Sequence, residues 1–191
     1  MPKKINCFIR YNGNTETQTT VDALNSSGWV DKVFVVSPES VQIENAETLA
    51  CPHPYSTETI IKIAEKSSTA FSFLALNEGG LSLGQFAPER LLQVAENTGA
   101  AMVYADYYEI KNCSQLPHPV IDYQQGSLRD DFNFGPVQLF RSDVLHSFDE
   151  ESFRQAGFYS LCLHASRAGE FIRIPEYLFT MKETDTRKSG E

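Results

Sequence analysis

The sequence has few basic residues and no long apolar run. Its 191 residues include 16 lysines and arginines against 25 aspartates and glutamates, which gives a formal net charge of -9. Such a charge repels polyphosphate backbones, so nucleic acid is not an expected partner. No apolar stretch reaches the length of a transmembrane helix, and the one near the N-terminus is too short for a signal peptide. These absences predict a cytoplasmic protein without a transmembrane segment.

Closely spaced metal-binding and redox motifs are also missing. The cysteines and histidines are scattered, with no near pair of the kind that a zinc site or a redox motif requires. The expected state of the cysteines is therefore a set of buried free thiols. The residues concerned are Cys7, Cys51, Cys113, Cys162, His53, His118, His146 and His164.

Glycine motifs of common enzymes are absent too. Gly79, Gly80 and Gly84 do not have the G-x-G-x-x-G spacing of a dinucleotide-binding loop, and no G-x-x-x-x-G-K-[ST] sequence occurs. There is no G-x-S-x-G nucleophile elbow either. These absences argue against a nicotinamide enzyme, a P-loop nucleotidase and an α/β-hydrolase.

What the chain does contain is an alternation of strand-like and helix-like segments. It is 41% hydrophobic, which suffices for a full core in one domain. Ser56 is expected to cap a helix, and Pro88 and Gly99 to begin and end another. The alternation predicts an α/β sandwich on a largely parallel sheet. Expected strands are 4–9, 32–37, 71–76, 100–110 and 136–140, and expected helices are 16–28, 57–68, 88–98, 142–148 and 154–169.

Two later stretches depart from this pattern. Residues 112–135 are rich in turn formers and too long for a simple connector, so we expect a functional loop attached through its aromatic side chains. Residues 171–174 and 176–181 are expected to form a hairpin-like pair around Pro175.

The order of several segments resembles the family 2 glycosyltransferases with the GT-A fold. These segments are RYNGN after the first strand, KVFVVSPES, FLALNEGG, APERLL, MVYADYYEI, PVQLFRSDVL and FIRIPEYLF. MVYADYYEI and QQGSLRDDFNFG are similar to a bacterial subgroup of that family. The resemblance implies one GT-A domain over residues 1–182, with a mostly parallel central sheet flanked by helices. Residues 183–191 are expected to be a tail, whose end resembles a stopping point inside a longer family member.

The resemblance implies transfer of a hexosyl group, with inversion, from a nucleotide-sugar donor to a carbohydrate or glycoconjugate acceptor. Family members usually use Mg²⁺ or Mn²⁺, because the leaving diphosphate concentrates negative charge. Asn77 and Glu78 stand where the family has a pair of aspartates, so this DXD motif is degenerate. Glu78 is the expected metal ligand, with Asn77 near the diphosphate. Alternatively, NEGG is merely a glycine-rich turn.

Other positions follow from the same resemblance. Arg10, Tyr11 and Asn12 end the first strand, where family members contact the nucleotide. Ser37 and Glu39 lie in the turn that usually contacts base and ribose. For the first three residues, a purely structural role at a strand end is an equal alternative.

Asp106, Asp130 and Asp131 complete the candidate set. Asp106 is a ligand-contact candidate or an inward structural cap. The helix that usually begins with the catalytic base begins here with Gln155-Ala156-Gly157 and carries no carboxylate. Asp130 and Asp131 are therefore the candidate bases, with a solvated turn beside Arg129 as the alternative.

Two other functions stay open at the level of sequence. A catalytically silent binding or scaffold domain would explain the missing aspartates and the missing base. A nucleotidyltransferase fits less well, because RYNGNTETQ lacks the lysine that such enzymes need after the first strand.

Overall fold

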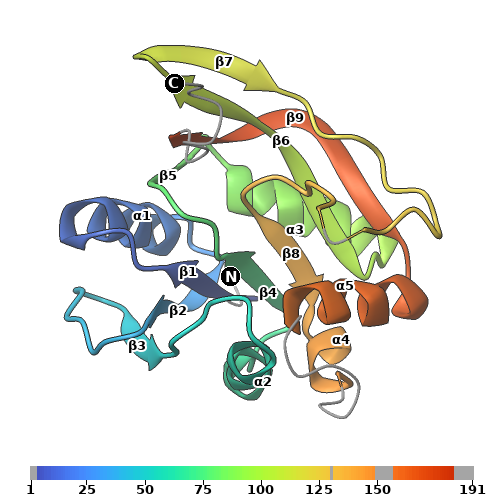
Figure 1. Ribbon diagram of the computed structural model, residues 1–191, viewed down its shortest axis with the longest axis horizontal. Coiled ribbons are helices and arrows are strands. Elements are labelled where there is room, and N and C mark those ends of the chain that lie inside the picture. Colours follow the sequence, from blue (N-terminus) through green and yellow to red (C-terminus); the bar gives the residue numbers. More distant parts are fainter. Residues whose placement is uncertain (1–3, 130, 149–156, 183–191) are drawn as a thin grey trace, which may run out of the picture.

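The computed structural model describes residues 4–129, 131–148 and 157–182, which form one curled sheet with helices on both faces (Figure 1). The strand order is β3-β2-β1-β4-β8-β6-β9-β5, and β7 pairs with β6 outside this path. The strands are β1 (Ile5–Arg10), β2 (Val30–Ser37), β3 (Glu47–Ala50), β4 (Phe71–Ala75), β5 (Leu81–Leu83), β6 (Met102–Lys111), β7 (Ser114–His118), β8 (Gln138–Arg141) and β9 (Phe171–Lys182).

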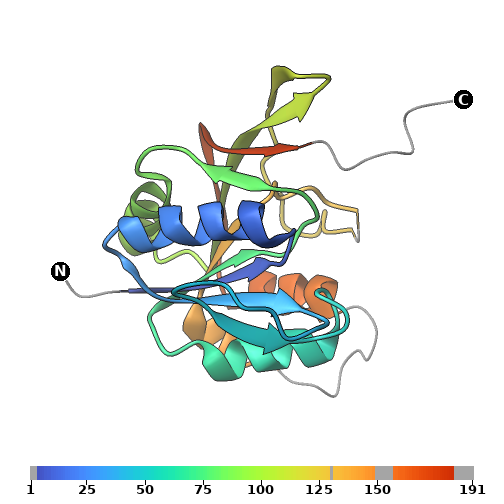
Figure 2. The same ribbon diagram turned by 90° about the vertical axis from the view of Figure 1, so that its left-hand side faces the viewer.

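The helices divide between the two faces of the sheet (Figure 2). α1 and α3 lie on one face, whereas α2, α4 and α5 pack together on the other. The expected caps are present: the Ser56 hydroxyl accepts from the backbone N–H of Thr59, and Gly99 ends its helix at a φ of 68°. The helices are α1 (Asn14–Ser26), α2 (Thr57–Lys66), α3 (Ala87–Thr98), α4 (Ser142–His146) and α5 (Gly157–Ala168).

The first half of the sheet is parallel. β1 pairs in parallel with β2 and with β4, and β2 pairs in parallel with β3. The carboxyl ends of β1, β2 and β4 therefore reach one edge of the sheet, where open α/β folds bind ligands.

The second half is mixed. β8 is antiparallel to both β4 and β6, and β6 is parallel to β9 but antiparallel to β7. Among the described residues, four strand pairings are parallel and four antiparallel, since β5 also runs antiparallel to β9. The reversed β8 brings its first residue, Gln138, opposite Leu74 near the carboxyl end of β4.

The expected hairpin around Pro175 is wrong, because β9 is a single strand from Phe171 to Lys182. Ala105 pairs with Ile174, whereas the next residue of β6, Asp106, pairs with Tyr177. Pro175, which has no N–H to donate, lies in the resulting irregularity with Glu176. Arg90 of α3 binds Glu176 there, with its Nη2 at 2.6 Å from Oε1.

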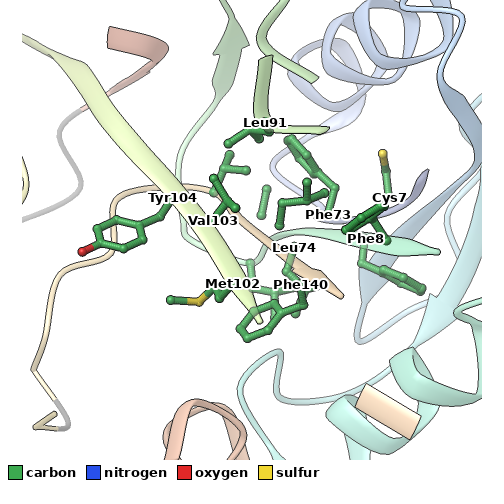
Figure 3. Packing of buried hydrophobic residues seen from close by; sticks show 14 of the residues in the cluster. Cys7, Phe8, Phe73, Leu74, Leu91, Met102, Val103, Tyr104 and Phe140 are labelled. Atoms are coloured by element: carbon green, nitrogen blue, oxygen red, sulfur yellow. The ribbon is translucent and has the colours of Figure 1, made fainter. Parts of the chain in front are cut away.

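The core lies on both faces of β4, β6 and β8 (Figure 3). Leu91 of α3 covers one face, while Phe140 and Met102 lie toward the other. Tyr104 is fully buried, yet its side chain points away from the centre of this cluster (Figure 3). Its hydroxyl donates to the carbonyl of Ile121 at 2.9 Å and accepts from the backbone N–H of Tyr123 at 2.8 Å. The core thereby holds the long loop against the sheet, as its aromatic content led us to expect.

No helix in the described part of the chain is both long enough and apolar enough to cross a membrane.

Candidate ligand site

The loops after β1 and β4 are joined at the carboxyl edge of the sheet. The Asn12 side chain donates from Nδ2 to the Gly79 carbonyl at 2.9 Å, and its Oδ1 accepts from the Gly79 N–H at 3.2 Å. Gly79 has a φ of 98°, a conformation that a side chain would strain. These two hydrogen bonds hold the RYN segment (10–12) against the NEGG segment (77–80).

Arg10 and Glu78 form an ion pair at this edge. Arg10 Nη2 lies 2.6 Å from Glu78 Oε1, and the side chains are 26% and 64% exposed respectively. The guanidinium is thus held in the protein, while the carboxylate extends into solvent. Glu78 was expected to be a metal ligand, and in this structure its partner is an arginine.

Tyr55, in the turn before α2, is the partner of Asn77. Its hydroxyl donates to Asn77 Oδ1 at 2.6 Å. Tyr55 is 38% exposed as a whole residue, and the burial of its hydroxyl end raises its pKa to about 12, with opposite smaller effects from Arg10 and Glu78. The phenol therefore keeps its proton at neutral pH and remains a donor.

Two pockets adjoin at Asn77. The smaller, of about 20 Å³, lies between β1, α1 and the NEGG loop and is lined by Arg10, Asn12 and Asn77 among others. The larger, of about 410 Å³, lies between the Tyr55 turn, residues 128–129 and 131–135 of the long loop, and the start of α5. A volume of that order is typical of small-molecule sites.

The larger pocket combines aromatic rings with amide side chains. Tyr55 packs edge-on against Phe158 at a centroid distance of 5.7 Å, and the Phe158 N–H donates to the Tyr55 carbonyl at 3.1 Å. Aromatic faces and carboxamides together suit a ligand with both apolar and hydroxyl surface. The aromatic members are Tyr55, Phe132, Phe134, Phe158 and Tyr159, and the amide members are Asn77, Asn133 and Gln138.

Ionisable groups in this pocket are few. Asp131 lines it, is 69% exposed, and pairs with Arg129 at 3.2 Å. Asp130, the other candidate base, lies outside the described residues. Cys162 also lines the pocket, but burial raises the pKa of its thiol well above the usual value, so it is not a thiolate nucleophile.

The remaining nucleotide-contact candidates lie beside the end of β1. The Tyr11 hydroxyl donates to Asn14 Oδ1 at 2.6 Å, and the Tyr11 N–H donates to the Val36 carbonyl at 3.0 Å. Ser37 is buried, and its Oγ accepts from the N–H of Glu39, whose side chain is exposed. Ser37 and Glu39 lie at the same edge of the sheet as Arg10, but neither residue lines either pocket.

Asp106 lies elsewhere. It is 3% exposed, and its two carboxylate oxygens accept from Nε and Nη2 of Arg173, each at 2.9 Å. Its Oδ1 also accepts from the Val120 N–H at 3.0 Å. In this structure both carboxylate oxygens of Asp106 are therefore bound by other parts of the protein.

The residues present do not fit the divalent ion that the resemblance implies. Mg²⁺ and Mn²⁺ prefer carboxylate and carbonyl oxygens. Here the Glu78 carboxylate faces a guanidinium, and Asn77 Oδ1 accepts from Tyr55. Within residues 4–129, 131–148 and 157–182, no three carboxylate, imidazole or thiol side chains gather as a metal site.

Sequence reasoning missed several members of the site, Tyr55 above all. The signal was available, because Tyr55 directly precedes the N-cap Ser56 of a helix that begins at the carboxyl edge of the sheet. Asn133 and Gln138 were less accessible to prediction, since their position depends on the reversed β8.

Comparison with known proteins supports the fold and leaves the family open. No family model matches the sequence, and no curated protein matches it. Solved structures do match: the crystal structure of S. aureus TarS 1-349 superposes with a TM-score of 0.62 at 9% identity, over 94% of this chain. Structures of the same TarS fragment in complex with UDP-GlcNAc and with UDP give TM-scores of 0.61 each, at 9% and 11% identity.

These likenesses concern the fold. They confirm a single α/β domain of the GT-A type. The chain spans about 60% of the length of the TarS fragment in each superposition.

Proposed function

We propose that the chain is a glycosyltransferase-like domain that binds a nucleotide sugar with a uridine diphosphate moiety, such as UDP-GlcNAc. The observation that carries the proposal is the meeting of two pockets at Asn77. One is bounded by the end of β1 and the other by aromatic and amide side chains. The hydroxyl-rich ring of a nucleotide sugar matches the larger pocket. Its charged diphosphate would lie beside Arg10 and outside the smaller pocket, whose volume of about 20 Å³ is close to that of one water molecule.

The fold supports the same ligand class. TarS, whose fold this chain shares, has been crystallised with UDP-GlcNAc and with UDP. In open α/β domains, ligands bind at the carboxyl ends of the strands, which is where Arg10, Asn12 and Asn77 lie. We place the diphosphate near Arg10 and Asn12, and the sugar among Tyr55, Asn77 and the described loop residues 131–135.

If the domain is active, a carboxylate must take the proton of the acceptor hydroxyl. Asp131 lines the larger pocket and is the base that we propose among the described residues, with Asp130 beside it in the sequence. An inverting transfer of a hexosyl group to a carbohydrate or glycoconjugate acceptor would follow. The competing function is a catalytically silent sugar-nucleotide-binding domain, which the pairing of Asp131 with Arg129 favours.

Calorimetric titration tests the binding proposal. UDP-GlcNAc and UDP should bind the wild-type chain, and Asn77→Ala should weaken both by about tenfold, because it removes an amide shared by both pockets. The matched control is Asn97→Ala, an exposed amide of α3 that lines neither pocket, and this variant should bind as the wild type does. Equal binding by both variants, or none by the wild type, would exclude this site.

Release of UDP from UDP-GlcNAc separates the two functions. An enzyme should release UDP slowly even when water is the acceptor, and Asp131→Asn should abolish that release without changing the affinity for UDP. A binding domain should show affinity for UDP without release.

A further inference from the structure

The Arg10–Glu78 pair bears on how a diphosphate is neutralised at this site. A bound diphosphate brings concentrated negative charge, which needs either a divalent ion or fixed cationic donors. The one carboxylate of NEGG already faces a guanidinium at 2.6 Å. A divalent ion placed beside Glu78 would have to approach that guanidinium, and the two positive charges would repel each other.

The position of Arg10 is fixed by the sheet. It is the last residue of β1, it pairs with Val36 of β2, and its side chain is 26% exposed. Among the described residues, only Nη2 of its guanidinium has a hydrogen-bond partner. A guanidinium carries five N–H donors in a planar fork that matches phosphate oxygens, so most of its donors remain for a ligand.

Glu78 has the opposite character. Its side chain is 64% exposed and makes one contact with Arg10, from a loop that follows β4. An exposed ion pair of this kind contributes little free energy, so the carboxylate can turn into solvent when a stronger anion arrives. Glu78 then acts as a competitor for Arg10 and not as a ligand for a metal.

The side-chain oxygen of Asn77 also has a protein partner. Its Oδ1, the other oxygen expected near a metal, accepts the hydroxyl proton of Tyr55 at 2.6 Å. Tyr55 lies in the larger pocket, and its hydroxyl keeps Asn77 oriented toward that side. Both oxygen groups at the degenerate motif are therefore committed to protein partners.

We infer that Arg10 takes the place of the divalent ion, so that the site binds the diphosphate of a nucleotide without Mg²⁺ or Mn²⁺ and with Glu78 as a displaceable internal anion. The inference rests on the proposed nucleotide binding. It makes a prediction opposite to that of a metal site, because loss of a metal ligand weakens binding whereas loss of a competitor strengthens it.

The test is a calorimetric titration of UDP in EDTA and again in MnCl₂. The wild-type affinity should agree within about twofold between the two buffers. Glu78→Gln should tighten UDP binding by about two- to fivefold, the range expected for release of an exposed ion pair. Arg10→Gln should weaken it by about tenfold or more, as loss of a charged phosphate contact requires.

Glu47→Gln is the matched control for charge. Glu47 is 53% exposed, pairs with Lys32 at 3.0 Å, and lines neither pocket, so its variant removes the same charge from a similar ion pair. It should leave UDP affinity unchanged. Circular dichroism and thermal melting should show that Arg10→Gln is folded. Glu78→Gln changes a mostly exposed side chain, so its effect on UDP affinity can be measured even if Arg10→Gln does not fold.

Two results would overturn the inference in distinguishable ways. Binding of UDP that needs Mn²⁺ and disappears in Glu78→Gln would overturn the inference and leave the proposed nucleotide binding intact. No binding of UDP in either buffer would remove both. Titration with Mn²⁺ alone should give no saturable binding, and a Mn²⁺ site that is lost in Glu78→Gln would also contradict the inference.

Discussion

Asp106 and Glu78 are two carboxylates that each face an arginine, but in different surroundings. Asp106 is almost fully buried and binds Arg173 through both oxygens, whereas Glu78 is mostly exposed and binds Arg10 through one. Burial makes the first pair costly to break and exposure makes the second easy to exchange. Asp106 lies within β6 and Glu78 lies in the loop after β4. Sequence alone could not separate their roles, because the burial of each carboxylate depends on tertiary packing.

Replacing Asp106 should therefore reduce stability and leave the ligand site intact. Asp106→Ala leaves the Arg173 guanidinium, whose side chain is 19% exposed, without its bidentate partner. We expect a loss of about 3 kcal/mol in the free energy of unfolding, measured by urea denaturation. Asp122→Ala removes an exposed carboxylate from the same arginine and should cost less than about 1 kcal/mol. A stable Asp106→Ala protein that no longer binds UDP would show instead that Asp106 contacts ligand.

Tyr55 provides a test by pH. Its pKa is about 12 in the folded chain, mainly through burial, against about 10 when unfolded. The folded state thus holds the phenol proton more tightly, so the contribution of Tyr55 to stability is complete below pH 10 and is lost as the pH rises toward 12. The absorbance titration of wild type minus Tyr55→Phe at about 295 nm should have its midpoint near pH 12. A midpoint near pH 10 would mean that the hydroxyl is solvated and does not hold Asn77.

At the scale of elements, local sequence signals identified the long helices and the buried strands. Ser56, Pro88 and Gly99 mark helix ends through capping and backbone preferences that operate within one turn. Residues 47–50, 81–83 and 114–118 were not expected to be strands, because each is short and takes its conformation from pairing with a longer neighbour. Their structure depends on the assembled sheet more than on their own pattern.

The contact between α5 and α2 shapes one wall of the larger pocket. A Cβ on Gly157 would lie 2.3 Å from the backbone nitrogen of Thr57, which cannot yield as a flexible side chain can. Gly157→Ala should therefore separate the helices and cost about 1–3 kcal/mol in urea unfolding, with weaker UDP binding. A Cβ on Gly169, just after the other end of α5, would lie 3.2 Å from the Ala101 Cβ and 3.4 Å from the Ala101 nitrogen, so Gly169→Ala should cost less. Equal effects of the two variants would contradict this account of the wall.

At the scale of the whole molecule, the site is made where a parallel half of the sheet meets a mixed half. RYN follows β1 and NEGG follows β4, and these parallel strands bring both segments to the carboxyl edge. The sequence did not predict that Gln138, Asn133 and the aromatic side chains would line the site, since β8 runs antiparallel to β4 and β6. The resemblance to a known family supplied the fold, while the partner of each charged side chain required coordinates.

Ligand binding should stabilise the whole domain. A ligand at about 100 times its dissociation constant adds about 2.7 kcal/mol to the free energy of unfolding. For a domain of this size the melting temperature should rise by about 5–10 °C in UDP, as measured by differential scanning fluorimetry. Asn77→Ala should lose most of that rise at the same UDP concentration. An identical rise in Asn77→Ala would place the nucleotide away from the shared edge.

The central claim is that one nucleotide sugar binds across Asn77, with its sugar in the larger pocket and its diphosphate beside Arg10. The most direct measurement is a crystal structure of the protein grown with UDP-GlcNAc in EDTA. We predict density for the diphosphate against Arg10 and Asn12, density for the sugar beside Tyr55 and Asn77, and Glu78 turned toward solvent. Density at another surface, such as the groove between Trp29 and Phe86, with Arg10 still bound to Glu78, would contradict the account.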